Sequence, residues 1–166
     1  MARPLILVTM GTNEYPFSRL YNYIKNDPLY LDDRCEWFVQ SGSCETTTRP
    51  ACGVIEALIP RSDMEDLVRR SALVISHCGI GSLNLMLKYR KRVVFVPRVA
   101  SHKEFSDDHQ LQIAAEIKSR RMQVVFPSDE FPALSYEQIV ADNVLSEPVD
   151  ITNYDLASIV NLKLTG

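Results

Sequence analysis

The sequence has no long hydrophobic run and no pair of closely spaced cysteines. Its longest apolar runs, among them Leu5–Val8 and Val93–Val96, are four residues each, whereas a helix that spans a bilayer needs about 20 apolar residues. The four cysteines are 9, 8 and 26 residues apart, without a C-x-x-C pair, so the spacings typical of zinc and redox sites are absent. We therefore expect no membrane-spanning segment, and reduced cysteines that serve mainly in packing.

The sequence also has no excess of either charge. It contains 18 Lys and Arg against 21 Asp and Glu, for a net charge of -3, which gives no long-range field to gather nucleic acid or acidic lipid. The N-terminus lacks the apolar stretch and cleavage site of a secretory signal. We expect a cytoplasmic protein with no nucleic-acid partner. The 166 residues, 46% of them apolar, fit one globular domain over residues 1–166.

Apolar runs alternate with helix-period segments along the chain, a pattern typical of β-α units around a mainly parallel sheet. The predicted strands are Leu5–Thr9, Glu36–Gln40, Val54–Leu58, Leu73–Ser76, Val93–Val96 and Met122–Phe126. The predicted helices begin near Arg19, Ser62, Leu83, Asp107, Ser135 and Asn153, and Ser62, Ser135 and Asn153 are the expected N-caps. The fold class is therefore α/β, a doubly wound parallel sheet with its ligands beyond the carboxyl ends of the strands.

Two glycine-containing loops after predicted strands could bind a phosphate. Gly11-Thr12-Asn13-Glu14 follows the first strand, and the backbone N–H groups of such a turn can meet an anion. A tight strand exit would also explain Gly11. In the second loop, Gly79 and Gly81 lie at the start of a helix, where the dipole favours a diphosphate. A third glycine and a later acid are missing, so we do not expect an NAD site.

A polar cluster follows the fifth predicted strand, over Arg98–Gln110. Carboxylate, amide and imidazole side chains grouped at a strand end suit the many hydroxyls of a sugar. A solvated loop before a charged helix start would explain the same residues. A metal site through His102, Glu104 and His109 is irregular in spacing and is not favoured. Nor is a nucleophilic Cys78, since no G-x-C-x-G elbow surrounds that thiol.

Three motifs recur in one order at three expected strand ends. Ile6–Leu20 contains Gly-Thr-x-Glu-x-Pro-Phe-x-Arg-Leu, Val74–Gly79 contains Ser-His-x-Gly, and Val96–Gln110 contains Pro-Arg…Glu…Asp-His-Gln. Over about Leu5–Ile117 the chain thus resembles PssE-type glycosyltransferase subunits. That family is related to the C-terminal, donor-binding half of GT-B enzymes of glycosyltransferase family 28, such as the MurG-like group and the dolichol-linked N-acetylglucosamine transferase. The resemblance implies a single Rossmann-like domain equivalent to that half.

The resemblance also implies a partner, because GT-B enzymes need two Rossmann-like domains and this chain has room for one. The second would be a membrane-anchored PssD-type subunit that binds a lipid-linked glycan acceptor. The chain would then be the donor-binding, catalytic subunit of an inverting glycosyltransferase in exopolysaccharide or capsule biosynthesis. It would use a UDP-sugar as substrate, need no cofactor or metal, and lie at the inner face of the cell membrane through its partner.

By the same resemblance, the matched motifs supply the donor site. The diphosphate would lie on Gly79, Ile80, Gly81 and Ser82, facing Gly11, Thr12 and Asn13. The sugar or ribose hydroxyls would be bound by Glu104, Asp108, His109 and Gln110. Arg98 and His77 would neutralise charge on the departing phosphate, and Glu14 is the local candidate for a general base. Leu85 stands where related enzymes often carry a ribose-binding acid.

The donor sugar and the reaction itself leave alternatives open. Glucuronic acid is favoured because Arg98 could meet its carboxylate, and galactose comes next. A non-catalytic nucleotide-sugar-binding regulatory module would share the same site. A free-standing nucleotide-sugar hydrolase or epimerase would act without a partner.

Overall fold

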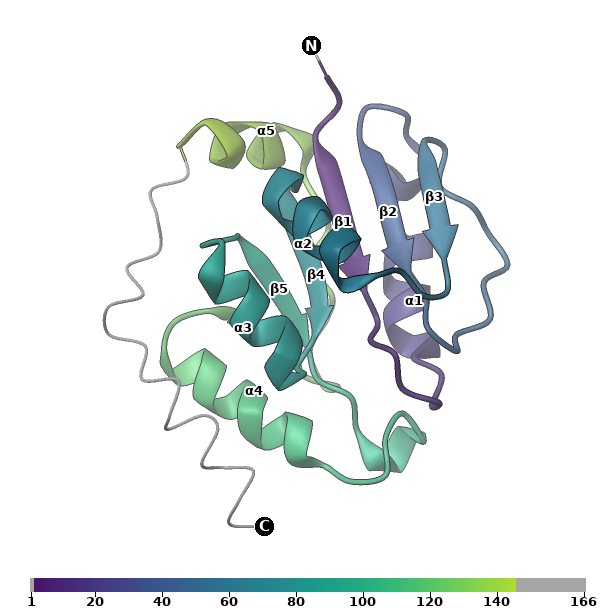
Figure 1. Ribbon diagram of the computed structural model, residues 1–166, viewed down its shortest axis with the longest axis vertical. Coiled ribbons are helices and arrows are strands. Elements are labelled where there is room, and N and C mark those ends of the chain that lie inside the picture. Colours follow the sequence, from purple (N-terminus) through teal and green to yellow (C-terminus); the bar gives the residue numbers. More distant parts are fainter. Residues whose placement is uncertain (1, 146–166) are drawn as a thin grey trace.

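The computed structural model describes residues 2–145 and shows one six-stranded sheet between two layers of helices (Figure 1). The sheet order is β3-β2-β1-β4-β5-β6, with all neighbouring strands parallel. This is the strand order of the Rossmann fold, so the prediction of a doubly wound α/β domain is confirmed. The strands are β1 (Leu5–Thr9), β2 (Glu36–Gln40), β3 (Gly53–Glu56), β4 (Leu73–His77), β5 (Val93–Val96) and β6 (Gln123–Val124).

The helices divide between the two faces of the sheet according to the alternation of side chains along the strands. Ile6 and Val8 of β1 point into one core with α1, η1 and α5, while Leu5 and Leu7 point into the other with α2, α3 and α4. Because both faces of β1 are covered, all five of its residues are buried. The helices are α1 (Ser18–Lys25), η1 (Pro28–Leu31), α2 (Arg61–Arg70), α3 (Ile80–Lys88), η2 (Ala100–His102), α4 (His109–Ser119) and α5 (Tyr136–Leu145).

The edges of the sheet and several helix starts differ from the sequence prediction. Strand β3 ends at Glu56, before the predicted Leu58, which is 63% exposed. Helix α2 begins at Arg61 with Pro60 as its N-cap, so the prediction of a Ser62 cap is wrong; the Ser62 hydroxyl instead donates to Asp63. The Ser135 cap is confirmed, since its Oγ accepts a hydrogen bond from the Gln138 amide at 3.3 Å.

Strand β6 keeps only two of the five predicted residues, as an edge strand with one neighbour. Helix α4 begins at His109, two residues later than predicted. The predicted helix from Asn153 lies outside the described residues. Across residues 2–145, no helix is both long enough and apolar enough to cross a bilayer.

Candidate functional site

A pocket of about 460 Å³ lies where the chain leaves the two central strands in opposite directions. After β1 the chain turns to α1 on one face, and after β4 it turns to α3 on the other, so a crevice opens at the strands' carboxyl ends. The volume is that of a typical small-molecule site. The pocket is lined by Thr9, Gly11, Thr12, Gln40, Ile59, Arg61, Met64, His77, Gly81, Ser82, Leu85 and Met86.

The first turn of α3 forms one wall of this pocket. Its N-cap, Gly79, is extended and provides no side-chain cap, so the N–H groups of the first turn keep their capacity to bind an anion. A Cβ atom at Gly81 would meet no described atom within 4 Å. Because glycine in a helix costs about 1 kcal/mol relative to alanine and packing does not require it here, Gly81 leaves room for a ligand.

The His77 ring is held between two glycines at the back of the pocket. A Cβ atom at Gly79 would lie 2.3 Å from His77 Cε1, and one at Gly11 would lie 2.9 Å from His77 Nε2. The ring nitrogen Nε2 is 3.0 Å from Ser82 Oγ. Burial, together with the positive charge of Arg98, lowers the pKa of His77 to about 3. The imidazole is therefore neutral at physiological pH and offers a hydrogen bond rather than a charge.

Gln40, at the end of β2, fixes the Gly11 turn from the other side. Its Oε1 accepts hydrogen bonds from Thr9 Oγ1 at 2.8 Å and the Gly11 amide at 3.2 Å. Its Nε2 donates to Gly11 O at 2.9 Å. Gly11 has φ +85°, a conformation that glycine adopts without strain. The Gly11 amide is therefore already bonded within the protein, whereas the neighbouring Thr12 is exposed.

Arg98 is fully enclosed rather than directed at the pocket. The residue is 1% exposed, and its Nη1 donates to the backbone oxygens of Tyr15 and Glu104, each at 2.7 Å. Its Nη2 donates to Met10 O. Burial lowers the pKa of Arg98 to about 10, so the guanidinium stays charged at neutral pH. Arg98 therefore joins the loop after β1 to the loop after β5. Its enclosed guanidinium is not positioned to contact a phosphate in the pocket.

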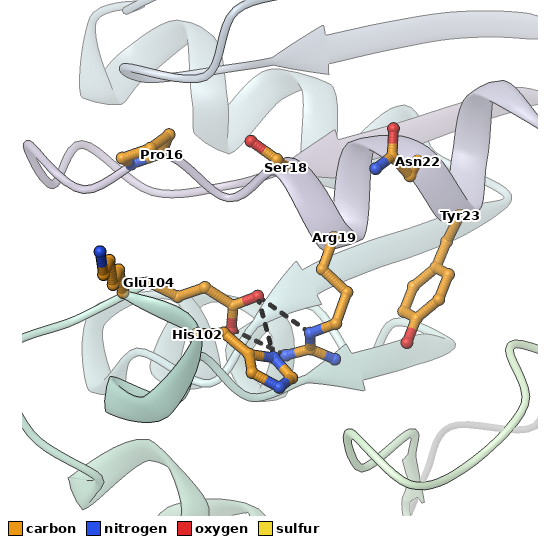
Figure 2. A pocket seen from close by; sticks show the side chains of 8 residues that line it. Pro16, Ser18, Arg19, Asn22, Tyr23, His102 and Glu104 are labelled. Atoms are coloured by element: carbon orange, nitrogen blue, oxygen red, sulfur yellow. Dashed lines mark hydrogen bonds and ion pairs between the residues drawn. The ribbon is translucent and has the colours of Figure 1, made fainter.

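Glu104 is likewise engaged within the protein (Figure 2). Its carboxylate accepts hydrogen bonds from Arg19 Nε and Nη2, both at 2.9 Å, and from the Val99 amide at 3.0 Å. Figure 2 shows this ion pair at the wall of a second pocket, of about 430 Å³, between α1 and the η2 loop. With 3% of its surface exposed, Glu104 has little capacity left for a sugar hydroxyl.

Gln110 bridges the loops that follow β4 and β5. Its Oε1 accepts hydrogen bonds from the Cys78 and Arg98 amides, both at 3.1 Å. The residue is 3% exposed, and its Nε2 lies 3.4 Å from His77 Nδ1. Gln110 therefore positions His77 and the start of α3 from behind, whereas the family resemblance implied a contact with the sugar or ribose hydroxyls.

The remaining predicted residues lie nearer the surface. Asp108 is exposed, with Oδ1 accepting from the Ala100 amide at 2.8 Å, and His109 stacks edge-on against Phe105 with 4.8 Å between ring centroids. Asn13 Oδ1 caps its own turn by accepting from the Tyr15 amide at 2.8 Å. Glu14 is exposed on the same turn.

Residues 5–144 match the glycosyltransferase family 28 C-terminal domain. The chain belongs to this family. Similar solved structures include the glycosyltransferase SnogD from Streptomyces nogalater (14% identity, TM-score 0.56), the spinosyn forosaminyltransferase SpnP (12%, 0.58) and MurG from Acinetobacter baumannii (15%, 0.50). At these identities the likeness shows the fold. No curated protein matches the sequence.

The family 28 domain spans less than half of the length of these solved enzymes. The similarity to SnogD, SpnP and MurG covers 98%, 99% and 100% of this chain but 43%, 39% and 47% of theirs. The six-stranded sheet thus corresponds to one part of a GT-B glycosyltransferase, the C-terminal Rossmann-like half.

Four pocket residues of this family 28 domain, Ile59, Arg61, Met64 and Met86, were not singled out from the sequence. Ile59, Met64 and Met86 form an apolar wall with Leu85, and Arg61 supplies a cation beside it. Arg61 lies outside the three motifs, at the start of a helix whose predicted cap was Ser62. These residues reach the pocket because α2 and α3 pack on the same face of the sheet, a contact between segments that local spacing does not reveal.

The two less favoured chemistries of the domain find no support in the described residues. Within residues 2–145, no three His, Cys, Asp or Glu side chains gather closely enough to hold a metal ion. The Cys78 thiol is buried in the core with α3 and α4, and its burial raises its pKa far above neutral. A protonated, enclosed thiol is not a nucleophile.

Proposed function

We propose that this family 28 domain is the donor-binding, catalytic subunit of a two-component glycosyltransferase of PssE type. It would transfer a sugar from a UDP-sugar to a lipid-linked glycan acceptor, with inversion at the anomeric carbon. A membrane-anchored PssD-type subunit would supply the acceptor wall. The observation that carries the proposal is the 460 Å³ pocket, in which the uncapped start of α3 meets an open Gly81.

The proposed binding mode divides the donor along the pocket. The diphosphate would lie on the first turn of α3, over Gly79, Ile80, Gly81 and Ser82, with Thr12 opposite. The base and ribose would pack on the apolar wall of Ile59, Met64 and Leu85. Asp108 and His109, at the exposed start of α4, would bind sugar hydroxyls. Arg98, Glu104 and Gln110 would hold these loops in place from within.

For the transfer step, Glu14 is the proposed general base of this chain. Its carboxylate is exposed on the β1 loop, where an acceptor held by the partner could approach. A general base contributes about 10²–10⁴-fold. Glu14→Gln should therefore reduce transfer by that factor and leave donor affinity unchanged; equal transfer rates would assign the base to the partner. His77, as a neutral imidazole, would act by holding Ser82.

We propose glucuronic acid and galactose as the candidate donor sugars. The preference for glucuronic acid rests on Arg98, which is enclosed and bonded to backbone oxygens. Arg61 is the cation that lines the pocket, and its side chain is 91% exposed. A sugar carboxylate would have to reach Arg61 instead, so direct titration must decide between the two sugars.

The test is calorimetric titration of the chain with UDP, UDP-glucuronic acid, UDP-galactose and UDP-N-acetylglucosamine, with and without magnesium. We expect one UDP-sugar to bind and Gly81→Asp to weaken it by about 100-fold or more, since a carboxylate would then face the diphosphate. Asn84→Asp is the matched control, because it adds the same charge to α3 at an exposed residue outside the pocket lining. If the Gly81→Asp variant bound the UDP-sugar as tightly as the wild type, the diphosphate would not lie at the start of α3.

Product analysis then separates this proposal from its two alternatives. The two-component enzyme should form glycolipid only when the PssD-type subunit is added. A regulatory module would bind donor and form no product in either case. A hydrolase or epimerase would release UDP or a new sugar from the chain alone.

A further inference from the structure

The second pocket, of about 430 Å³, takes no part in the proposed binding of the donor (Figure 2). Its volume is that of a small-molecule site. It lies at the carboxyl edge of the sheet, between the start of α1, which follows β1, and the η2 loop, which follows β5. We call the 460 Å³ pocket at the start of α3 the donor pocket. The second pocket is lined by Pro16, Ser18, Arg19, Asn22, Tyr23, His102, Lys103 and Glu104.

One wall of the second pocket is held rigidly by contacts within the protein. Besides its ion pair with Glu104, Arg19 donates from Nη2 to Pro97 O at 2.6 Å. The Arg19 guanidinium also lies 5.8 Å from the centre of the Tyr23 ring, and Tyr23 stacks on Phe131 with 5.1 Å between ring centroids. Because these groups fix one another, the wall is formed before any ligand arrives.

The rim of the second pocket carries exposed polar side chains from two elements. Ser18 and Asn22 are four residues apart on α1 and therefore share one face of the helix. His102 and Lys103 come from the η2 loop, and Figure 2 shows Ser18 and Asn22 on α1 with His102 on the facing loop. All four residues are exposed. A hydroxyl, an amide, an imidazole and an ammonium group therefore surround the opening.

These groups suit a sugar better than a phosphate. Hydroxyl, amide and imidazole groups can both donate and accept hydrogen bonds, as the hydroxyls of a sugar do. The charge of Arg19 is balanced by Glu104, at 2.9 Å. Lys103 supplies a donor for a sugar oxygen, or a counter-charge for the carboxylate of an acidic sugar.

Lys103 has a backbone conformation that favours glycine. Its φ of 57° and ψ of 32° are left-handed, at the end of η2. Glycine adopts this conformation without strain, whereas residues with a Cβ atom do not. A lysine here is therefore better explained by the use of its ammonium group than by the turn itself.

The loop between β1 and α1 leads from the donor pocket to the second pocket. Thr12 lines the first and Pro16 lines the second, and Glu14, the proposed general base, is two residues from each. With 3.8 Å between consecutive Cα atoms, the Cα of Glu14 is at most about 8 Å from those of Thr12 and Pro16. Since a general base must contact the acceptor hydroxyl, an acceptor at Glu14 has the second pocket beside it.

Contacts on both sides of Glu14 fix this loop. The Tyr15 backbone oxygen accepts a hydrogen bond from Arg98 Nη1 at 2.7 Å, and the Tyr15 ring lies 6.1 Å from that of Phe105. The Tyr15 amide donates to Asn13 Oδ1 at 2.8 Å. The fold therefore sets the position of Glu14 relative to both pockets.

We propose that the second pocket binds a sugar unit of the acceptor glycan, next to the unit whose hydroxyl is activated at Glu14. This inference rests on the proposed function. The reacting sugar lies at Glu14, and the preceding unit lies between α1 and the η2 loop. The chain then forms part of the acceptor site itself, beside the wall supplied by the PssD-type subunit. The acceptor is accordingly a glycan of at least two sugar units.

The test is the kinetics of the two-subunit enzyme, with a radiolabelled UDP-sugar and the lipid-linked glycan extracted from the source cells as acceptor. Asn22→Ala should raise the KM for the acceptor by about 3- to 10-fold, the effect of one lost hydrogen bond, and leave the KM for the UDP-sugar unchanged. Asn26→Ala is the matched control, because it makes the same change one turn along at an exposed residue outside the pocket lining.

Lys103→Gly provides a second comparison. It removes the ammonium group and relieves the left-handed strain, so it should fold at least as well and raise the KM for the acceptor by about 10-fold or more. Arg90→Gly makes the equivalent change at another exposed, left-handed cation (φ 50°), after the end of α3. This control should keep the wild-type KM for the acceptor.

Two kinetic results would overturn the proposal. One is a KM for the acceptor that is the same in Asn22→Ala and Lys103→Gly as in their controls. The other is weaker binding of the PssD-type subunit with an unchanged KM for the acceptor, because the pocket would then be a subunit interface.

Failure of the proposed function has a different signature, since the wild-type pair would then form no glycolipid at all. A binding measurement on the chain alone tests the second pocket separately. The oligosaccharide released from the same lipid by mild acid should shift the amides of Asn22 and Lys103. If these amides did not move, the pocket would not be an acceptor site.

Discussion

The two candidate binding regions at the carboxyl edge of the sheet, the start of α3 and the loop after β5, differ in how much of their hydrogen-bonding capacity the protein itself uses. Around α3, Gly81 faces open space and the first turn lacks a side-chain cap. Around β5, Arg98, Glu104 and Gln110 are each 3% exposed or less and bond to one another's backbone and to neighbouring loops. The first region has unused binding capacity and the second has almost none. A polar residue at a strand end is thus a ligand contact only when the fold leaves it unpaired.

The largest expected effect comes from removing the centre of the buried region. Arg98→Met would leave three carbonyl oxygens, two buried and one partly buried, without their donor, and we expect a loss of about 3–5 kcal/mol in the free energy of unfolding. Arg61→Met, at an exposed arginine of the pocket, should change stability by less than about 0.5 kcal/mol. Urea denaturation measures both. If Arg98→Met cost no more than Arg61→Met, Arg98 would not be a structural residue.

The next effect distinguishes the two glycines of the α3 loop. Gly79→Ala would place a methyl group against the His77 ring, and we expect about 1–3 kcal/mol of destabilisation from overpacking. Gly81→Ala meets no neighbour and should stabilise the helix by about 1 kcal/mol, while donor affinity falls. Thermal melting and titration of both variants check this. Destabilisation of the same size in both variants would show that Gly81 also has a packing role.

A smaller effect concerns the pH dependence that His77 imposes. Its pKa of about 3 in the folded protein lies below the value of about 6.5 in an unfolded chain, so between these values only the unfolded state binds the proton. The stabilisation is complete above pH 6.5 and is lost as the pH falls, by up to about 1.4 kcal/mol per pH unit.

Urea denaturation between pH 7 and pH 5 measures this contribution. His77→Gln should show a shallower loss of stability than the wild type. Parallel curves for the wild type and His77→Gln would mean that His77 titrates normally and is not enclosed.

The central strands were predictable because their signal is local. Leu5–Thr9 and Val93–Val96 are continuous apolar or β-branched runs, as expected for strands buried on both faces. The position of Gly79 and Gly81 at the start of a helix was also predicted from the sequence. The edge strands were predicted too long, since β3 and β6 each have a single neighbour to pair with.

The burial of the β5 cluster could not be predicted from its spacing. The partners of Arg98 and Glu104 are Met10, Tyr15 and Arg19, which lie about 80 to 90 residues earlier in the chain. The sequence identified residue types suited to a sugar. It could not show that their hydrogen-bonding groups are occupied by other parts of the protein. The position of Arg61 in the pocket lining could not be predicted from the sequence either, because only the packing of α2 brings it to the pocket.

Mapping of amide chemical shifts during a titration with the UDP-sugar tests the central claim most directly. Donor binding at the α3 start should shift the amides of Gly79, Ile80, Gly81 and Ser82 together with Thr12, and leave His102 and Lys103, in the second pocket, nearly unchanged. If the largest shifts instead fell on His102 and Lys103, with the α3 amides unmoved, the donor would occupy the pocket beside Glu104, and the start of α3 would not be the diphosphate site.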